Sequence, residues 1–161
     1  MSSRIDAEVA GGLGPGTQYD PSLPQPLVGT LRYEFQGWLG DELVTTSGYW
    51  IVTEELASSL AASDLTGYEL ADVIVTKDEQ YDLMPHAHEL PTWRRLIPTG
   101  TPDVDDFGLE GRTGLIVSDA ALDLLRTHRL DHAELSPADR PAPVSPIMQR
   151  FLAMREARSD D

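Results

Sequence analysis

The segment IVTEELASSLAASDLTGYEL (residues 51–70) aligns without a gap with IVSDAALDLLRTHRLDHAEL (residues 116–135), so each residue of the first has a counterpart at a constant offset. Each segment begins with an apolar pair, continues with a hydroxyl residue and an acid, and then carries leucines at helical spacing. The identical pairs are Ile51/Ile116, Val52/Val117, Leu60/Leu125, Leu65/Leu130, Glu69/Glu134 and Leu70/Leu135. Caps and apolar periods recur in unrelated helices, but a gap-free register of this length favours a duplicated strand–helix–strand unit.

The start of each helix is marked by polar residues. Thr53 and Ser118 stand directly before the leucine-bearing part, where a hydroxyl side chain caps a helix. Glu54 and Asp119 follow in the first turn, where the helix dipole favours acids. Gly67 comes after the first helix and suits a left-handed C-terminal cap. We therefore expect two helices that each begin directly after an apolar strand and lead into another strand.

Further strands are expected outside the two copies. Residues 31–36 alternate between apolar and polar side chains, as in a half-buried strand, and residues 93–98 form a short run between prolines. The chain has the length of about one domain. We predict a single α+β domain over residues 28–140, in which the copies at about 48–76 and 113–136 share a mixed sheet.

The two ends of the chain have a different composition. Residues 1–27 are rich in glycine and proline, which predicts a flexible arm that buries little. Residues 141–161 contain a proline-rich connection and an amphipathic helix. Ile147, Phe151 and Leu152 lie on one side of that helix, so we expect it to dock on the domain.

The charge and the cysteine content limit the classes of function. Twenty-seven acids against 12 bases give a net charge of −15, which disfavours binding to nucleic acid or anionic membranes and favours cationic partners. Solubility or adaptation to salt would explain the same charge. The absence of cysteine excludes disulfides and thiolate chemistry, and no apolar run reaches the ~18 residues of a membrane span. We expect a cytoplasmic protein.

Two histidine pairs have spacings that metal sites use. His86 and His88 form a His-x-His pair, but no convincing third ligand lies nearby and the flanking prolines indicate a surface loop. His128 and His132 are at positions i and i+4, but the repeat ends the helix before the second of them and no acid of the His-Glu-x-x-His type lies between. His86 and His88 remain weak candidates, and the sequence predicts neither a metal site nor a cofactor.

Acids and aromatics offer candidate partner-binding residues. Asp103, Asp105 and Asp106 lie in one glycine-containing loop, which lacks the acids that an EF-hand needs at its fifth and twelfth positions. Trp38 and Trp93 belong in the core if the strands that carry them are covered, and would anchor an interface if one is exposed. The sequence contains no nucleophile elbow, Walker loop or dinucleotide fingerprint. We therefore expect no catalytic residue.

The stretches YEFQGWLGDELVTT, WIVTEEL, LTGYEL, LPTWRRLIPTG, DDFGL and LIVSDAALDLLRTHRLDHAEL resemble a set of small bacterial proteins with Val-Ser-Glu helix starts, Leu-Thr-Gly exits and an Asp-Asp-Phe-Gly loop. Similar units look like those in immunity proteins of bacterial polymorphic-toxin systems. The likeness covers about residues 30–136, and Asp131-His132 replaces the Thr-Gly exit in the second copy. The resemblance implies a protein-binding role and carries over no catalytic residue.

The leading functional hypothesis is a non-enzymatic protein that binds a cationic protein, such as an immunity protein that neutralises a toxin. One alternative is a small-molecule-binding or enzymatic accessory protein of a bacterial biosynthetic cluster. The other is a structural homo-oligomer, and the oligomeric state itself is left open by the sequence.

Overall fold

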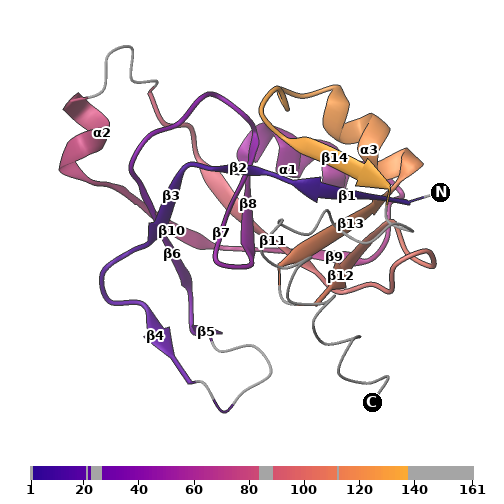
Figure 1. Ribbon diagram of the computed structural model, residues 1–161, viewed down its shortest axis with the longest axis horizontal. Helices are drawn as coiled ribbons and strands as arrows, with labels where there is room; N and C mark the ends of the chain where they lie inside the picture. Colours follow the sequence, from indigo (N-terminus) through magenta and orange to yellow (C-terminus); the bar gives the residue numbers. More distant parts are fainter. Residues whose placement is uncertain (1, 21, 23–26, 84–88, 112, 138–161) are drawn as a thin grey trace, which may run out of the picture.

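The computed structural model describes residues 2–20, 22, 27–83, 89–111 and 113–137. In these parts of the chain it contains three helices and fourteen short strands, and the predicted α+β class is confirmed (Figure 1). The helices are α1 (Glu54–Ala61), α2 (Glu79–Leu83) and α3 (Asp119–Arg126). The strands are β1 (Ser2–Asp6), β2 (Glu8–Val9), β3 (Gly11–Leu13), β4 (Gln18–Tyr19), β5 (Leu27–Val28), β6 (Leu31–Phe35), β7 (Leu43–Thr46), β8 (Tyr49–Thr53), β9 (Tyr68–Ala71), β10 (Val73–Lys77), β11 (Trp93–Pro98), β12 (Phe107–Glu110), β13 (Gly114–Ser118) and β14 (Glu134–Pro137).

The two copies occupy two sheets with the same plan, rather than one shared sheet. One sheet has the order β2-β7-β8-β11-β9 and the other the order β12-β13-β1-β14. In the first, Arg95 of β11 pairs with Ile51 and Ala71, and in the second, Arg4 of β1 pairs with Ile116 and Ser136. Ile51 and Ile116 are a matched pair of the alignment, and Ala71 and Ser136 directly follow the two aligned segments. The duplication therefore extends to the strand register.

One interior strand of each sheet comes from the other repeat. β1 precedes the hairpin β7–β8 in the chain but pairs with β13 and β14, and β11 precedes the hairpin β12–β13 but pairs with β8 and β9. We define the first repeat as β1, β7, β8, α1 and β9, and the second as β11, β12, β13, α3 and β14. The repeats have exchanged their first strands, which ties them into one domain.

The prediction of a flexible arm over residues 1–27 is wrong for the described part of that segment. β1 is an interior strand of its sheet, and Ile5 is 1% exposed. The glycines have a packing role, since a Cβ atom at Gly11 would overlap the carbonyl oxygen of Glu34 in the neighbouring strand β6. Composition suggested an arm for two reasons. The strand SSRID contains a single large apolar residue, and the glycines that permit close backbone packing are also typical of flexible segments.

The helix starts agree with the prediction. The Thr53 hydroxyl accepts a hydrogen bond from the N–H of Leu56 at 3.2 Å, and the Ser118 hydroxyl accepts one from the N–H of Ala121 at 3.1 Å. Gly67 has a left-handed backbone (φ 87°), but it does not cap α1, which ends at Ala61. It lies in the loop before β9.

The main core lies between the two repeats. Helices α1 and α3 lie side by side (Figure 1), and their leucines pack with the inner faces of both sheets. The buried residues of this core include Ile5, Leu43, Trp50, Val52, Leu56, Leu60, Leu96, Phe107, Leu115, Val117, Leu122 and Leu125. The opposite face of the first repeat's sheet is covered by a third sheet, β10-β6-β3, with a second core of Leu31, Tyr33, Phe35, Val44, Ile51, Tyr81 and Trp93.

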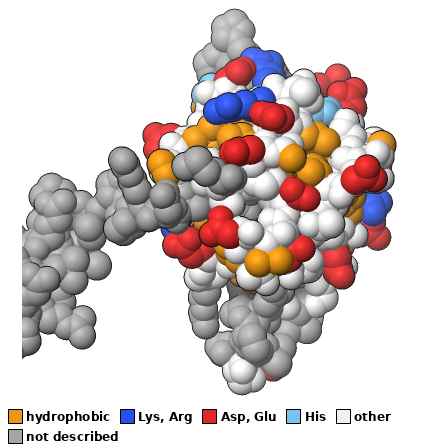
Figure 2. All heavy atoms as spheres, turned by 90° about the vertical axis from the view of Figure 1, so that its right-hand side faces the viewer, with side chains coloured by type: hydrophobic (Ala, Val, Ile, Leu, Met, Phe, Trp, Pro, Cys, Tyr) orange, Lys and Arg blue, Asp and Glu red, His pale blue; other side chains and the backbone are white. Residues whose placement is uncertain are grey.

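Acidic side chains are spread over the face seen in Figure 2, with apolar patches between them. No helix among the described residues combines the length and the apolar character that a membrane crossing requires. The predicted C-terminal helix in residues 141–161 lies outside the described residues.

Candidate functional site

The acidic loop predicted to bind a partner makes hydrogen bonds within the protein. Asp106 accepts hydrogen bonds from the Ser118 hydroxyl at 2.6 Å and from the N–H of Thr66 at 2.9 Å, and Asp105 accepts one from the N–H of Thr101 at 2.8 Å. The bond from Ser118 is the main reason why the pKa of Asp106 lies below its ordinary value. We name this set (Asp105, Asp106, Ser118 and Thr66) the Asp106 junction. It joins the cap of α3 to the loop that follows α1.

The tip of the same loop differs from its base. Asp103 is exposed and has a left-handed backbone (φ 67°), and the neighbouring Val104 is 78% exposed. Of the three predicted acids, Asp103 alone therefore projects to solvent. Asp105 and Asp106 have a structural role in the fold.

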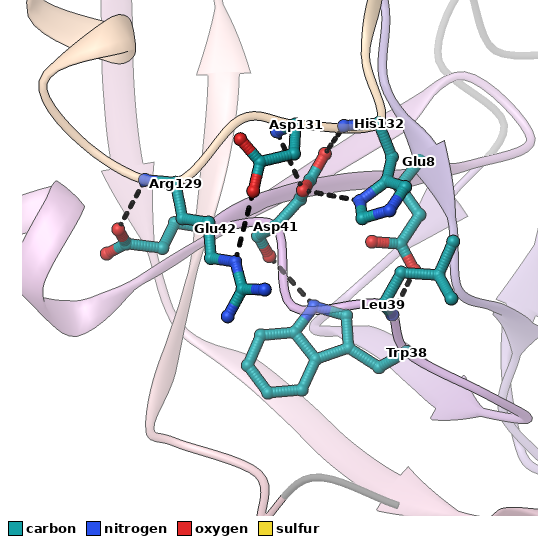
Figure 3. A network of polar contacts seen from close by, with 8 residues as sticks. All are labelled: Glu8, Trp38, Leu39, Asp41, Glu42, Arg129, Asp131 and His132. Carbon is teal, nitrogen blue, oxygen red and sulfur yellow. Dashed lines mark hydrogen bonds and ion pairs between the residues drawn. The ribbon is translucent and has the colours of Figure 1, made fainter. Parts of the chain in front are cut away.

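An equivalent junction joins the cap of α1 to the loop after α3. Glu42 accepts hydrogen bonds from the Thr53 hydroxyl at 2.7 Å and from the N–H of Arg129 at 2.8 Å (Figure 3), and it pairs with the ring of His128 at 3.1 Å. Burial raises the pKa of Glu42, but the bonds from Arg129, Thr53 and His128 outweigh it, so the pKa lies below its ordinary value. We name Asp41, Glu42 and the loop 128–132 the Asp41 junction.

The two junctions correspond in their backbone contacts as well. The carbonyl oxygen of Glu42 accepts from the N–H of Thr53 at 3.0 Å, and that of Asp106 accepts from the N–H of Ser118 at 2.9 Å. The alignment of the two copies shifts by one position at Glu42 and Asp106, because the turn between β12 and β13 is one residue longer than the turn between β7 and β8. Each carboxylate therefore connects its own repeat's helix to the other repeat.

The complete burial of Asp41, together with His132 and Glu8, distinguishes the Asp41 junction from the Asp106 junction, in which Asp105 is partly exposed. The Asp41 carboxylate is fully buried and accepts hydrogen bonds from the N–H groups of Asp131 at 3.0 Å and His132 at 2.8 Å. The Nδ1 atom of His132 lies 2.9 Å from the same carboxylate (Figure 3). The hydrogen bond that the ring of His132 makes to the Asp41 carboxylate is the main reason why the pKa of His132 is raised.

Glu8 completes this group from strand β2. One of its carboxylate oxygens, Oε2, accepts a hydrogen bond from the N–H of Leu39 at 2.7 Å. The other, Oε1, is buried and has no hydrogen-bond partner among the described residues. Burial raises the pKa of Glu8, while the N–H of Leu39 acts in the opposite direction. Glu8, Asp41 and His132 each have one oxygen or nitrogen atom of a kind that binds metal ions. These three atoms lie within 4.8 Å of one another.

A pocket of about 400 Å³ opens beside this group. Trp38 lies between the two, because its Nε1–H donates to the carbonyl oxygen of Asp41 at 2.8 Å while its ring lines the pocket. We name this cavity the Trp38 pocket. Its lining residues are Trp38, Gly40, Glu42, Thr53, Glu54, Glu55, Pro91, Thr92 and Arg129.

The structure separates the two tryptophans proposed from the sequence. Trp93 is 4% exposed and packs edge-on behind Trp38 with ring centroids 5.4 Å apart, so it cannot anchor a partner directly. Trp38 is only partly buried and faces the pocket. His86 and His88 lie outside the described residues.

Sequence reasoning missed Glu8, Asp41 and His132 as a group. One signal was present, since His132 takes the position that Gly67 has in the first copy and breaks the Thr-Gly pattern there. His128 and His132 do not act together, because α3 ends at Arg126 and the two rings contact Glu42 and Asp41 respectively. Glu8 could not be assigned, since its segment was expected to be an arm.

No protein-family model, curated protein or solved structure matches this chain. The resemblance to immunity proteins therefore remains a hypothesis from the sequence.

Proposed function

We propose that this protein binds a basic segment of a protein partner, and that the Trp38 pocket receives one lysine or arginine side chain of that segment. The observation that carries the proposal is the composition of the pocket, where Trp38 lies with three glutamates, Glu42, Glu54 and Glu55, against a single lining cation, Arg129. An indole face attracts cations, and carboxylates form charge-assisted hydrogen bonds with guanidinium and ammonium groups.

The three glutamates would contribute differently. Glu42 already accepts hydrogen bonds from Thr53 and Arg129, so it supplies charge to the pocket more than new contacts. Glu54 and Glu55 are exposed in the first turn of α1. Their carboxylates are the natural acceptors for a ligand's N–H groups.

The surroundings of the pocket suit a protein partner. Leu39 is 54% exposed and Val9 is 69% exposed, and the bond from the N–H of Leu39 to Glu8 brings the two segments together. Apolar side chains next to a charged pocket are typical of interface anchors. The net charge of −15 and the acids spread over the surface (Figure 2) would speed the approach of a cationic protein and disfavour nucleic acid.

More specifically, we propose that this protein is a cytoplasmic immunity protein that occludes a cationic toxin. Its support is the resemblance in sequence together with the acidic surface. Its test is growth of cells that express the product of the neighbouring gene with and without this protein. Rescue by the wild type and loss of rescue by Trp38→Ala are the expected results, and a neighbouring product that is not toxic contradicts this form.

Binding itself is tested by calorimetric titration with an arginine-rich peptide and a glutamate-rich peptide of the same length. We expect binding of the basic peptide alone, weakened at least tenfold by Glu54→Gln/Glu55→Gln. The matched control is Glu69→Gln/Glu134→Gln, which removes the same charge from two exposed acids that do not line the pocket. An equal loss of peptide affinity in both double variants would mean that net charge alone causes the effect, and it would contradict binding in the Trp38 pocket.

A pocket of this volume is also within the range of small-ligand sites, which keeps the small-molecule alternative open. The same titration with free arginine separates the two. If free arginine binds as tightly as the peptide, the pocket itself is the whole site and the protein is a ligand-binding protein.

A further inference from the structure

Glu8, Asp41 and His132 come from three separate parts of the chain. Glu8 lies in β2, Asp41 precedes β7, and His132 lies in the loop between α3 and β14. Their ligand-type atoms nevertheless lie within 4.8 Å of one another. Figure 3 shows the carboxylates of Glu8 and Asp41 on either side of the imidazole ring of His132.

The free oxygen of Glu8 is the observation that calls for a ligand. Glu8 is 8% exposed, and its Oε1 makes no hydrogen bond with the described residues, although the N–H of Asp41 lies near enough to lower the pKa of this carboxyl. A buried carboxylate oxygen without a partner costs free energy. Protonation of Glu8 would not remove the problem, because the added O–H would then need an acceptor that the described residues do not supply at Oε1.

We propose that Glu8, Asp41 and His132 form a binding site for a divalent transition-metal ion of the zinc type. An imidazole nitrogen with two carboxylates is a donor set that zinc accepts, whereas calcium prefers six to eight oxygen ligands. The ion would give Glu8 Oε1 its missing partner and would balance the charge of two buried carboxylates.

The geometry allows the site to close around an ion. Ligand atoms around a tetrahedral zinc ion lie roughly 3.4 Å apart, so donors within 4.8 Å of one another need to approach by at most about 1.4 Å. His132 can make this movement, since its side chain is 38% exposed and lies in a loop. That exposure also provides the entry path, and it leaves room for a water molecule as fourth ligand.

Metal binding would hold together the segments around the Trp38 pocket. Asp41 is connected to Trp38 through its carbonyl oxygen, and Glu8 is connected to Leu39 through its Oε2. The site is independent of the proposed function, because its ligands do not line the pocket.

The test is calorimetric titration of the chelator-treated full-length protein with Zn²⁺, with Mg²⁺ and Ca²⁺ for comparison. We expect one equivalent of Zn²⁺ to bind at micromolar or tighter affinity, and Mg²⁺ and Ca²⁺ to bind at least 100-fold more weakly. Glu8→Gln should weaken Zn²⁺ binding at least tenfold. The double variant His86→Ala/His88→Ala should bind as the wild type does, because those histidines are the other candidates in the sequence.

Thermal melting gives a second readout that a merely structural role of Glu8 would not produce. Without metal, Glu8→Gln removes a buried charge but leaves amide N–H groups without an acceptor, so its own metal-free melting temperature is the baseline for the comparison. With Zn²⁺, the wild type should gain stability and Glu8→Gln should not. If Glu8→Gln does not fold, His132→Asn replaces it, because that change is at the surface. Zn²⁺ affinity that is unchanged in Glu8→Gln or His132→Asn, or that is lost in the His86→Ala/His88→Ala variant, overturns the site.

Discussion

The Asp41 junction and the Asp106 junction perform the same structural task, yet only one of them has gathered further ionisable groups. In both, a carboxylate accepts a hydrogen bond from a helix-capping hydroxyl and another from the loop after the opposite helix. The Asp41 junction adds His132, and Glu8 from the N-terminal segment, and its aspartate Asp41 is fully buried, whereas Asp105 of the Asp106 junction is partly exposed. The same connection between helix cap and opposite loop therefore occurs twice, and only at the Asp41 junction do additional ionisable side chains surround it.

The room available at each junction explains which one could be modified. At the Asp106 junction a Cβ atom on Gly67 would overlap the carbonyl oxygen of Phe107, so the exit loop packs directly against β12. At the equivalent position of the Asp41 junction stands His132, whose side chain reaches the Asp41 carboxylate and is 38% exposed. The departure from the repeat therefore marks the candidate site better than any motif does.

The largest expected effect concerns the exchanged strands. Deleting residues 2–6 removes an interior strand between β13 and β14, so the protein should fail to fold, as measured by circular dichroism. Ile5→Ala and Leu96→Ala, at 1% exposure in the two exchanged strands, should each cost about 2–5 kcal/mol in urea unfolding. A small loss at Ile5 beside a large loss at Leu96 would contradict the exchange and restore the flexible arm.

Removal of each junction's carboxylate should have a smaller and unequal effect. Asp41→Ala removes a fully buried carboxylate and leaves the part-buried N–H groups of Asp131 and His132 without their acceptor, which should cost about 3 kcal/mol. Asp106→Ala acts at a partly exposed position and should cost about 1–2 kcal/mol. Asp103→Asn, at the exposed tip, is the control, since asparagine also accepts the left-handed backbone there, and it should stay within about 0.5 kcal/mol.

Urea unfolding of the three aspartate variants measures these differences directly. Equal losses for Asp41→Ala and Asp106→Ala would mean that the additional groups around Asp41 contribute nothing to the fold. A loss at Asp103 as large as at Asp106 would mean that the loop tip is packed.

Much of the fold follows from local chemistry that the sequence displays. The caps at Thr53 and Ser118, the half-buried strand at 31–36 and the strand at 93–98 depend on residues close in the chain, and they were predicted. The exchange of first strands depends on pairing between residues such as Arg4 and Ile116, which no local pattern encodes. For that reason the sheet plan and the role of the N-terminus were not predicted.

The candidate site was less accessible to sequence reasoning for the same physical reason. Asp105 and Asp106 attracted attention because acids in a glycine-containing loop resemble a binding surface, but the Asp106 carboxylate accepts from donors as distant in the chain as Thr66 and Ser118. Trp38 and Trp93 were proposed together as partner-binding residues, and their burial could not be predicted: Trp38 lines the pocket, whereas Trp93 is 4% exposed. Glu8, Asp41 and His132 meet only when the strands have been exchanged.

The smallest expected effect is at His132, and it should depend on pH. The pKa of His132 is raised above its ordinary 6.5 by the bond to Asp41, so the protonated ring stabilises the folded state below pH 6.5 and this contribution is lost as pH rises through the folded-state pKa. His132→Ala should therefore cost more in metal-free protein at pH 6 than at pH 9. Because the ring is partly exposed and screened by solvent, the difference should stay below about 1 kcal/mol.

A double-mutant cycle identifies the source of that dependence. If the Asp41 carboxylate is the cause, His132→Ala in an Asp41→Asn background should cost the same at both pH values, measured by urea unfolding in the presence of a chelator. The Asp106 junction has no histidine in this place, so changes at Thr66 or Gly67 should show no such pH dependence between 6 and 9. A pH dependence that survives in the Asp41→Asn background would assign the raised pKa to other acids near the ring, with Glu8 and Asp131 as the nearest candidates, and would weaken the contrast between the two junctions.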